Sequence, residues 1–179
     1  EYETAVASGA RMCTHLFNAM SGVHHRDFGL ALAALTDERI SIGLIADMHH
    51  VSPRAVDLAF RARRDGIILV SDSVGWAAPW ATSRRVEIRD GAPRLPDGTL
   101  AGSSTNLGEC VRLAVKRGGA PLEAALIAAT AGPSAVIGES ESATIRVGGA
   151  ADIVALDKDL RVVGTWRRLV SSRGTPTDD

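Results

Sequence analysis

Side chains that can bind metal ions or transfer protons follow three apolar stretches of this 179-residue sequence. They are His15 after the first stretch, Asp47, His49 and His50 after the second, and Asp72 after the third. Imidazole and carboxylate groups are ligands that Zn²⁺ or Fe²⁺ prefers, and a carboxylate can act as general base towards a metal-bound water. A single such residue after a strand is commonly a structural cap or a turn former. Three in succession favour a functional site.

The three apolar stretches, residues 10–15, 39–47 and 66–73, are predicted to be buried strands. The second, RISIGLIAD, is continuous rather than alternating, which is typical of parallel strands covered on both faces. Helices are expected between the strands, at residues 30–36 and 54–64. This alternation indicates parallel βα units and therefore an α/β fold. Because the carboxyl ends of parallel strands open on one face, the three polar groups should meet there.

The second half of the chain is expected to hold further short elements. Apolar and polar residues alternate on both sides of Asp90-Gly91, which predicts a hairpin over residues 84–95. Residues 148–168 read as two short strands around a turn, which we attribute to a second, smaller domain. Between these regions we expect two helices and a helical turn, at residues 104–117, 121–129 and 134–138.

The composition excludes several classes of protein. Twenty basic against twenty-one acidic residues give a net charge of −1, so no overall field attracts nucleic acid or a membrane surface. The two cysteines, Cys13 and Cys110, lie far apart and form no CxxC motif. This excludes a disulfide framework and a zinc knuckle, and it favours a reducing, cytoplasmic location. No apolar run approaches the roughly 20 residues of a membrane span, and no signal peptide is visible.

Six motifs occur along the sequence: THLFNAM, HHRDFG, LIADMHHV, LVSDSV, LAGS and ADIVALD. In residues, order and spacing, from about residue 8 to residue 168, the chain resembles the N-acetylglucosamine-6-phosphate deacetylases of the amidohydrolase superfamily. The resemblance implies a (β/α)₈ barrel with a small β domain made from both chain ends. It also implies metal-dependent hydrolysis of the acetamide of N-acetylglucosamine 6-phosphate, giving glucosamine 6-phosphate and acetate in amino-sugar catabolism.

The resemblance assigns chemical roles to three residues. His15 matches the metal-ligating histidine after strand six, and His50 matches the substrate-polarising histidine after strand seven. Asp72 matches the catalytic aspartate after strand eight. The implied cofactor is a divalent metal, zinc or iron, whose identity and number the sequence leaves open.

The resemblance also assigns substrate contacts. Asn18 and Ala19 match the pair that contacts the sugar, and Arg26 matches the arginine that grips the 6-phosphate, in the family often across a dimer interface. The implied partners are a sugar-phosphate substrate and a second copy of the complete enzyme, with no nucleic acid and no membrane. The loop that closes over the ligand is matched by Leu100, Ala101 and Gly102.

The chain departs from the family pattern in two places and lacks part of it. The family commonly has glycine and a small or apolar residue where Met48 and His49 stand, and TDA where SDS ends the third strand. The family's ligating glutamate, its other ligating histidine and its first five barrel strands have no counterpart. We expect residues 1–138 to form strands six to eight with the following helices, residues 139–170 the small-domain strands, and residues 171–179 a polar tail. The opening EYETAVASGARM reads as the end of a helix, so we expect an N-terminal portion to be missing.

Several features also allow other interpretations. The chain could be a catalytically inactive fragment or a subunit that pairs with a missing half, or a related cyclic-amide amidohydrolase. Arg26, beside His24 and His25, could belong to a solvated loop cluster. Residues 103–105 read as a plain loop and N-cap rather than a phosphate-cradling loop. Cys13 could be a nucleophile, although a buried inert cysteine is the commoner case, and no GxSxG motif supports a serine hydrolase.

Overall fold

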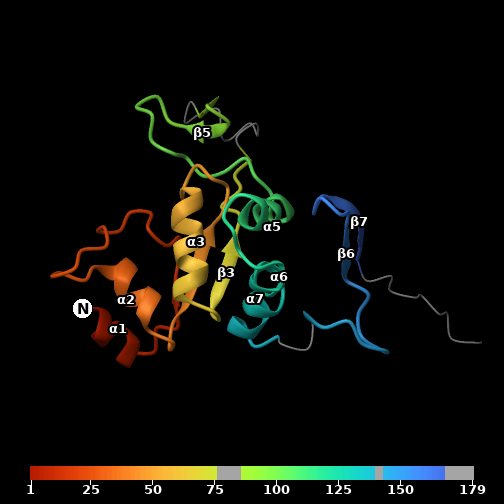
Figure 1. Ribbon diagram of the computed structural model, residues 1–179, viewed down its shortest axis with the longest axis horizontal. Coiled ribbons are helices and arrows are strands. Elements are labelled where there is room, and N and C mark those ends of the chain that lie inside the picture. The colour runs from red at the N-terminus through yellow and green to blue at the C-terminus, as the bar shows by residue number, and fades with distance from the viewer. Residues whose placement is uncertain (76–85, 140–142, 168–179) are drawn as a thin grey trace, which may run out of the picture.

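A sheet of three parallel strands lies at the centre of the computed structural model, which describes residues 1–75, 86–139 and 143–167 (Figure 1). The strands β1 (Met12–Cys13), β2 (Ser41–Ile45) and β3 (Ile67–Val70) lie in the order β1-β2-β3. The predicted parallel strands are confirmed. They are shorter than predicted because the backbone leaves the extended region at their polar ends, where His15 and Asp72 have φ angles of 38° and 49°.

The helices predicted between the strands are α2 (Leu30–Thr36) and α3 (Pro53–Ala62), and α1 (Tyr2–Ala7) precedes β1. Figure 1 shows α3 lying along the sheet, with α1 and α2 on the side of α3 away from β3. The side chain of Ser52 accepts a hydrogen bond from the Ala55 N–H, which caps α3 and satisfies one of its free amide groups. The core between these layers contains fully buried apolar side chains, including Leu16, Ile42, Leu44, Ile45 and Val56.

The predicted hairpin and helices of the second half are also present. Strands β4 (Glu87–Arg89) and β5 (Ala92–Arg94) pair antiparallel around the Asp90-Gly91 turn. Helices α5 (Leu107–Lys116), α6 (Leu122–Ala129) and α7 (Ala131–Val136) pack against β3. The prediction that α5 starts near residue 104 was wrong, because Asn106 provides its N-cap by accepting the Glu109 N–H. Residues 84 and 85 of the predicted hairpin lie outside the described residues.

The last two strands, β6 (Ile153–Leu156) and β7 (Val162–Trp166), pair antiparallel as predicted. This pair lies beside α5 in Figure 1, where a Cβ atom on Gly108 of α5 would come within 2.7 Å of Val162. The polar tail predicted at residues 171–179 lies outside the described residues. Within the described ranges the parallel sheet has three strands and does not close into a barrel. No helix in those ranges has the length and apolar character needed to cross a membrane.

A buried arginine joins α2, α3 and the start of β2. Arg63, at the end of α3, is only 6% exposed. Its guanidinium donates to the backbone carbonyls of Ala34 (2.9 Å), Asp37 (2.8 Å) and Ile40 (3.1 Å). The carbonyls at a helix C-terminus carry partial negative charge and lack partners within the helix. Arg63 therefore completes the end of α2 and holds the following turn in place.

Replacing this side chain should destabilise the fold strongly. Arg63→Met keeps an apolar stem but leaves three carbonyls without their donor, so we expect a loss of about 2–4 kcal/mol in the free energy of unfolding. Unfolding in urea would measure this loss in the free energy of unfolding. The matched control is Arg61→Met on the same helix, where an exposed pair with Asp57 is lost and the expected change is about 0–1 kcal/mol. Equal losses in the two variants would show that Arg63 has no special role.

Candidate functional site

The parallel register brings two predicted site residues to the same level. Ile45 of β2 is the register partner of Val70 of β3. Asp47 and Asp72 each lie two residues beyond that pair, at the carboxyl edge of the sheet. The hairpin of β4 and β5 lies above this edge in Figure 1, and a Cβ atom on its Gly91 would approach the His49 ring to 3.3 Å.

His50 lies between the two carboxylates. Its Nδ1 is 2.8 Å from Oδ2 of Asp47, and its Nε2 is 3.5 Å from Oδ2 of Asp72. The distance from Nδ1 to Asp47 is that of a hydrogen bond, whereas the distance from Nε2 to Asp72 is longer than hydrogen bonds usually are. Because an ionised carboxylate only accepts hydrogen bonds, Nδ1 donates its proton to Asp47. Nε2 then remains able to interact with a bound molecule.

The Asp47 carboxylate is fully buried, and polar donors compensate for its loss of water. Burial alone would raise the pKa of Asp47. Donors outweigh this effect and hold the pKa well below its ordinary value: the His50 side chain, the N–H groups of His50 and His49 (both 2.9 Å) and the Ser103 hydroxyl. The hydrogen bond with Asp47 in turn raises the pKa of His50, against the effect of burial, and the Asp72 charge adds to the increase. His50 is therefore held as a proton donor by an ionised partner.

Asp72 lies in a more open setting. Its side chain is 49% exposed, so its carboxylate can reach a molecule bound above the sheet. Its backbone carbonyl accepts a 2.8 Å hydrogen bond from the Ser103 N–H, which anchors the end of β3. A buried carboxylate facing an exposed one, with an imidazole between them, is suited to proton transfer and to stabilising negative charge on a substrate.

Strained backbone gathers at the ends of these strands. Positive φ angles are found at His15 (38°), Phe17 (73°), Ala19 (53°), Met48 (67°) and Asp72 (49°). In the described part of the chain these are five of seven such residues other than glycine. Each unusual conformation costs on the order of 1–3 kcal/mol and persists only where its surroundings enforce it. Clustering of strain is common at active sites, so it supports a functional role for this edge.

His15 lies at the same edge, after β1. Its Nδ1 is buried and has no hydrogen-bond partner among the described residues, as a nitrogen available to a metal would be. The described ranges contain no group of three His, Cys, Asp or Glu side chains arranged to hold a metal ion. His15 thus fits the role of one ligand, and a metal site would need further ligands from elsewhere.

The residues predicted to contact the sugar form a tight turn. Asn18 donates from Nδ2 to the carbonyls of His15 (3.3 Å) and Leu16 (3.1 Å). Ala19 and His15 both line a hollow of about 280 Å³ along β1. The structure therefore places Asn18 and Ala19 beside His15.

The predicted closing loop is held next to Asp72. Leu100 pairs with Arg94 of the hairpin, and the Ala101 N–H donates to the Pro93 carbonyl at 2.9 Å. Gly102 has a φ angle of 92°, and a Cβ atom there would come within 3.0 Å of the Asp72 carbonyl oxygen. Only glycine allows this close approach without displacement. Leu100, Ala101 and Gly102 thus connect the hairpin to the end of β3.

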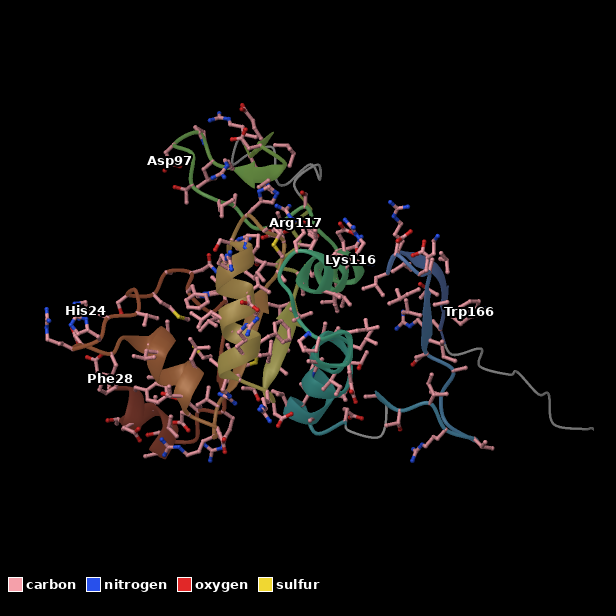
Figure 2. The ribbon with its side chains drawn as sticks, in the orientation of Figure 1. His24, Phe28, Asp97, Lys116, Arg117 and Trp166 are labelled. Carbon is pink, nitrogen blue, oxygen red and sulfur yellow. The ribbon has the colours of Figure 1, made fainter. Side chains whose placement is uncertain are left out.

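Arg26 is not brought to the other predicted site residues. It lies on an exposed loop, where its Nη1 is 2.7 Å from Nε2 of His25. Figure 2 shows His24 and Phe28 of this loop well away from Asp97, which lies in the turn after β5. Arg26 instead lines a hollow of about 840 Å³ together with Arg39, which precedes β2 at the opposite edge of the sheet.

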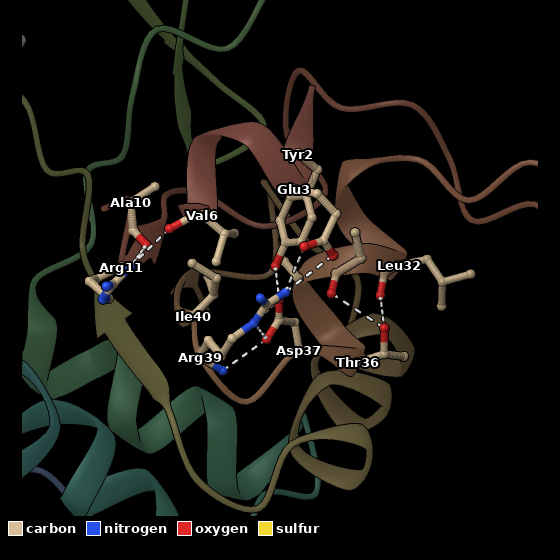
Figure 3. Close-up of polar contacts among 12 residues, drawn as sticks. Tyr2, Glu3, Val6, Ala10, Arg11, Leu32, Thr36, Asp37, Arg39 and Ile40 are labelled. Atoms are coloured by element: carbon tan, nitrogen blue, oxygen red, sulfur yellow. Dashed lines mark hydrogen bonds and ion pairs between the residues drawn. The ribbon is translucent and has the colours of Figure 1, made fainter. Parts of the chain in front are cut away.

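A polar network lies in that second hollow (Figure 3). Arg39 forms ion pairs with Asp37 (2.7 Å) and Glu3 (3.0 Å), and the Tyr2 hydroxyl donates to Asp37 at 3.1 Å. Burial, followed by this hydrogen bond, raises the pKa of Tyr2 to about 12. The network ties α1 to the turn before β2, which is a structural role.

The structure shows more about Asp47 and Ser103 than the sequence did. Asp47 was recognised as a strand-end residue but was given no specific role, although the spacing of Asp47 and His50 fits a turn that returns the imidazole to the carboxylate. Ser103, only 1% exposed, was assigned to a plain loop and N-cap. The loop is confirmed, whereas the N-cap was wrong, because Asn106 caps the following helix.

The sequence is similar to known amidohydrolases over nearly its whole length. The sequence profile of the Amidohydrolase family matches residues 1–174. The chain is 39% identical to an N-acetylglucosamine-6-phosphate deacetylase of Bos taurus over 92% of this chain and 43% of that protein. It is 34% identical to an N-acetylgalactosamine-6-phosphate deacetylase of Escherichia coli O157:H7, over 90% of this chain and 45% of that protein.

A solved structure shares the fold. N-acetyl-D-glucosamine-6-phosphate deacetylase from Mycobacterium smegmatis, a mutant in complex with N-acetyl-D-glucosamine-6-phosphate, superposes with a TM-score of 0.79 at 28% identity. The match covers 91% of this chain and 45% of that chain, so this chain spans less than half the length of these relatives. By its sequence profile, its relatives and its fold, the chain belongs to the amidohydrolase family and is a partial-length relative of the N-acetylglucosamine-6-phosphate deacetylases.

Proposed function

We propose that this segment forms one half of the active site of a cytoplasmic enzyme that hydrolyses the acetamide of N-acetylglucosamine 6-phosphate. The products are glucosamine 6-phosphate and acetate. The observation that carries the proposal is the position of His50, which donates to buried Asp47 on one side and faces exposed Asp72 on the other. The two buried free cysteines suit a reducing compartment.

Asp72, His50 and Asp47 have different roles in the proposed reaction. Asp72 accepts a proton from the attacking water and delivers it to the leaving amine, as a general base and then a general acid. His50 donates from Nε2 to the acetyl oxygen and stabilises the negative charge that develops there. Asp47 keeps His50 oriented for this donation through Nδ1.

The amidohydrolase family is typically metal-dependent, and His15 would hold the metal through its unpaired nitrogen. A bound divalent ion, zinc or iron, would supply Lewis acidity and lower the pKa of the attacking water. The remaining ligands would come from the portion of the enzyme that this chain does not include.

Substrate binding is assigned to two neighbouring segments and one remote residue. Asn18 and Ala19, beside His15, would contact the sugar, and the loop of Leu100, Ala101 and Gly102, beside Asp72, would cover it. Arg26 would hold the 6-phosphate of a substrate bound in a second subunit, which is consistent with its distance from the cluster here. The complete enzyme would therefore be a homodimer.

The relative from Escherichia coli favours one alternative substrate, the galactosamine epimer of the same sugar phosphate. The two substrates share the acetamide and the phosphate and differ at one hydroxyl, so the residues assigned above fit both. Comparing kcat/KM for the two sugar phosphates decides between them. A related cyclic-amide hydrolase, or an inactive subunit that pairs with a missing half, is the reading to adopt if neither sugar phosphate is hydrolysed.

Residues 1–179 alone should show no deacetylase activity. A zinc site needs at least three protein ligands, and His15 is the one ligand assigned in this chain. We expect zinc affinity weaker than micromolar in calorimetry and no glucosamine 6-phosphate release, with the complete enzyme as the positive control. Turnover by the zinc-loaded chain, or sub-micromolar affinity that survives His15→Ala, would contradict the assignment.

In the complete enzyme, Asp72→Asn should separate chemistry from binding. The amide has nearly the same shape but accepts no proton, so kcat should fall by roughly 10²–10⁴-fold with KM within about two-fold. Asp65→Asn, at the exposed opposite end of the same strand, is the control and should leave kcat unchanged. A variant at Asp72 that lost binding instead of turnover would assign Asp72 to substrate binding.

Arg26→Ala should affect only the phosphorylated sugar. Loss of a charge-assisted contact should raise KM for N-acetylglucosamine 6-phosphate about ten-fold or more. Unphosphorylated N-acetylglucosamine, which offers nothing to the guanidinium, should change little. Arg64→Ala, an exposed arginine just before β3, serves as the control. If both sugars bound more weakly by the same factor, Arg26 would have a structural role.

A further inference from the structure

We propose that Arg94, on strand β5 of the hairpin, binds the carboxylate of acetate, one of the two products of the proposed reaction. The inference rests on the proposed function, and it concerns a residue that lies outside the six sequence motifs. Hydrolysis adds water across the amide C–N bond, so the nitrogen leaves as an ammonium group and the acetyl group leaves as an acetate anion. The reaction therefore creates a carboxylate at the carbon that is attacked, and none of the roles assigned above provides a cation to hold it.

The hairpin that carries Arg94 contacts the candidate site at both ends of β5. Before the strand, a Cβ atom on Gly91 would approach the His49 ring to 3.3 Å. At the end of the strand, Arg94 forms an antiparallel bridge with Leu100, the first residue of the loop that continues to the end of β3. Figure 1 shows the hairpin above the carboxyl edge of the sheet. The backbone that holds Arg94 is thus tied to the site on both sides.

The guanidinium of Arg94 has donors that its own turn does not use. Nη1 donates to the Gly98 carbonyl at 2.8 Å, which fixes the side chain. Nε is buried and has no hydrogen-bond partner among the described residues. A guanidinium presents Nε and the adjacent Nη2 as a fork that matches the two oxygens of a carboxylate. Because Gly98 occupies Nη1, this fork is the part of the side chain that can bind a carboxylate.

The charge of Arg94 has no carboxylate partner in the part of the chain that the structure describes. Its register partner on β4, Glu87, forms an ion pair with Arg89 at 2.9 Å instead. Arg94 is half-buried, and a partly desolvated cation without a counterion is unfavourable. An anion bound at the Nε side would therefore be held by charge as well as by hydrogen bonds.

The position of Arg94 favours acetate over the 6-phosphate as that anion. The hydrogen bond with Asp47 raises the pKa of His50, and the positive charge of Arg94 acts against this increase. Arg94 therefore lies near enough to His50 for their charges to interact, at the edge where the acetyl group would react. The 6-phosphate is attached across the sugar ring from the acetamide and is assigned to Arg26.

Product inhibition of the complete enzyme tests the assignment. Arg94→Met should raise the inhibition constant of acetate about ten-fold or more, because a charge-assisted pair is lost. The inhibition constant of glucosamine 6-phosphate, the other product, should stay within about two-fold, and so should KM for the substrate. Arg94→Lys, which keeps the charge but not the fork, should recover only part of the acetate affinity.

The matched control is Arg89→Met on the neighbouring strand. It removes an exposed guanidinium that is paired with Glu87, so the inhibition constant of acetate should not change. An unchanged acetate constant in Arg94→Met would overturn the proposal. Equal weakening of both products would also overturn it, because a distorted hairpin would have that effect. Weaker inhibition by inorganic phosphate with unchanged inhibition by acetate would overturn it by assigning Arg94 to phosphate.

A binding measurement without turnover distinguishes this inference from the proposed function. The NMR line width of isotope-labelled acetate, mixed with the complete enzyme and no sugar, reports acetate binding directly. If an enzyme that hydrolyses neither sugar phosphate broadens this line, and Arg94→Met but not Arg89→Met abolishes the broadening, the proposed function fails and the carboxylate site stands. If an active deacetylase shows the same broadening in both variants, the proposed function stands and the role of Arg94 fails.

Discussion

A buried negative charge is the constraint on which the rest of the site depends. The Asp47 side chain has no exposure to solvent, and an ionised carboxylate without water is tolerated only where donors replace it. Its hydrogen-bond donors are the N–H groups of His49 and His50 and the His50 imidazole, all from its own turn. The loop of residues 100–103 lies next to this edge, where it pairs with the hairpin and with the end of β3.

The parallel register brings the residues of the proposed site together. Because Ile45 and Val70 pair, the two aspartates that follow them emerge at one level, and His50 spans the space between them. β2 is the central strand, so its end is the best supported of the three. At the opposite edge, Arg63 and the Arg39 network secure the turn that leads into β2. The reactive edge is thus supported by interactions at the far end of the same strand.

Local patterns were sufficient to predict the strands, the helices and the row of polar strand ends. Such features depend on hydrophobic runs and caps that lie within a few residues of each other. The helix start at α5 was misplaced because the run from Ser103 to Asn106 consists of residues that can all act as N-caps. Contacts in the folded chain decide among them. The Ser103 hydroxyl accepts from the Thr105 N–H and the Ser104 hydroxyl donates to the Gly91 carbonyl, which leaves Asn106 to cap the helix.

The position of Ser103 and the remoteness of Arg26 were beyond local patterns for the same reason. Ser103 lies beside Asp72 because the chain returns to the end of β3 after the hairpin. Arg26 resembles a site residue in sequence, yet the long loop that carries it leads away from the strands, and loop paths are set by contacts that no motif encodes.

The backbone conformation of Met48 bears on which residues this position can accept. The backbone there has a φ of 67°, a conformation that glycine adopts freely, and the resemblance leads one to expect glycine at this position. Methionine instead packs its half-buried side chain against the core. It also restricts the unfolded chain more than glycine does, so less conformational entropy is lost on folding. Burial of the Met48 side chain and the smaller entropy loss of the chain thus offset the strain of the native turn. The residue at this position can therefore differ from glycine while the backbone follows the same path to His50.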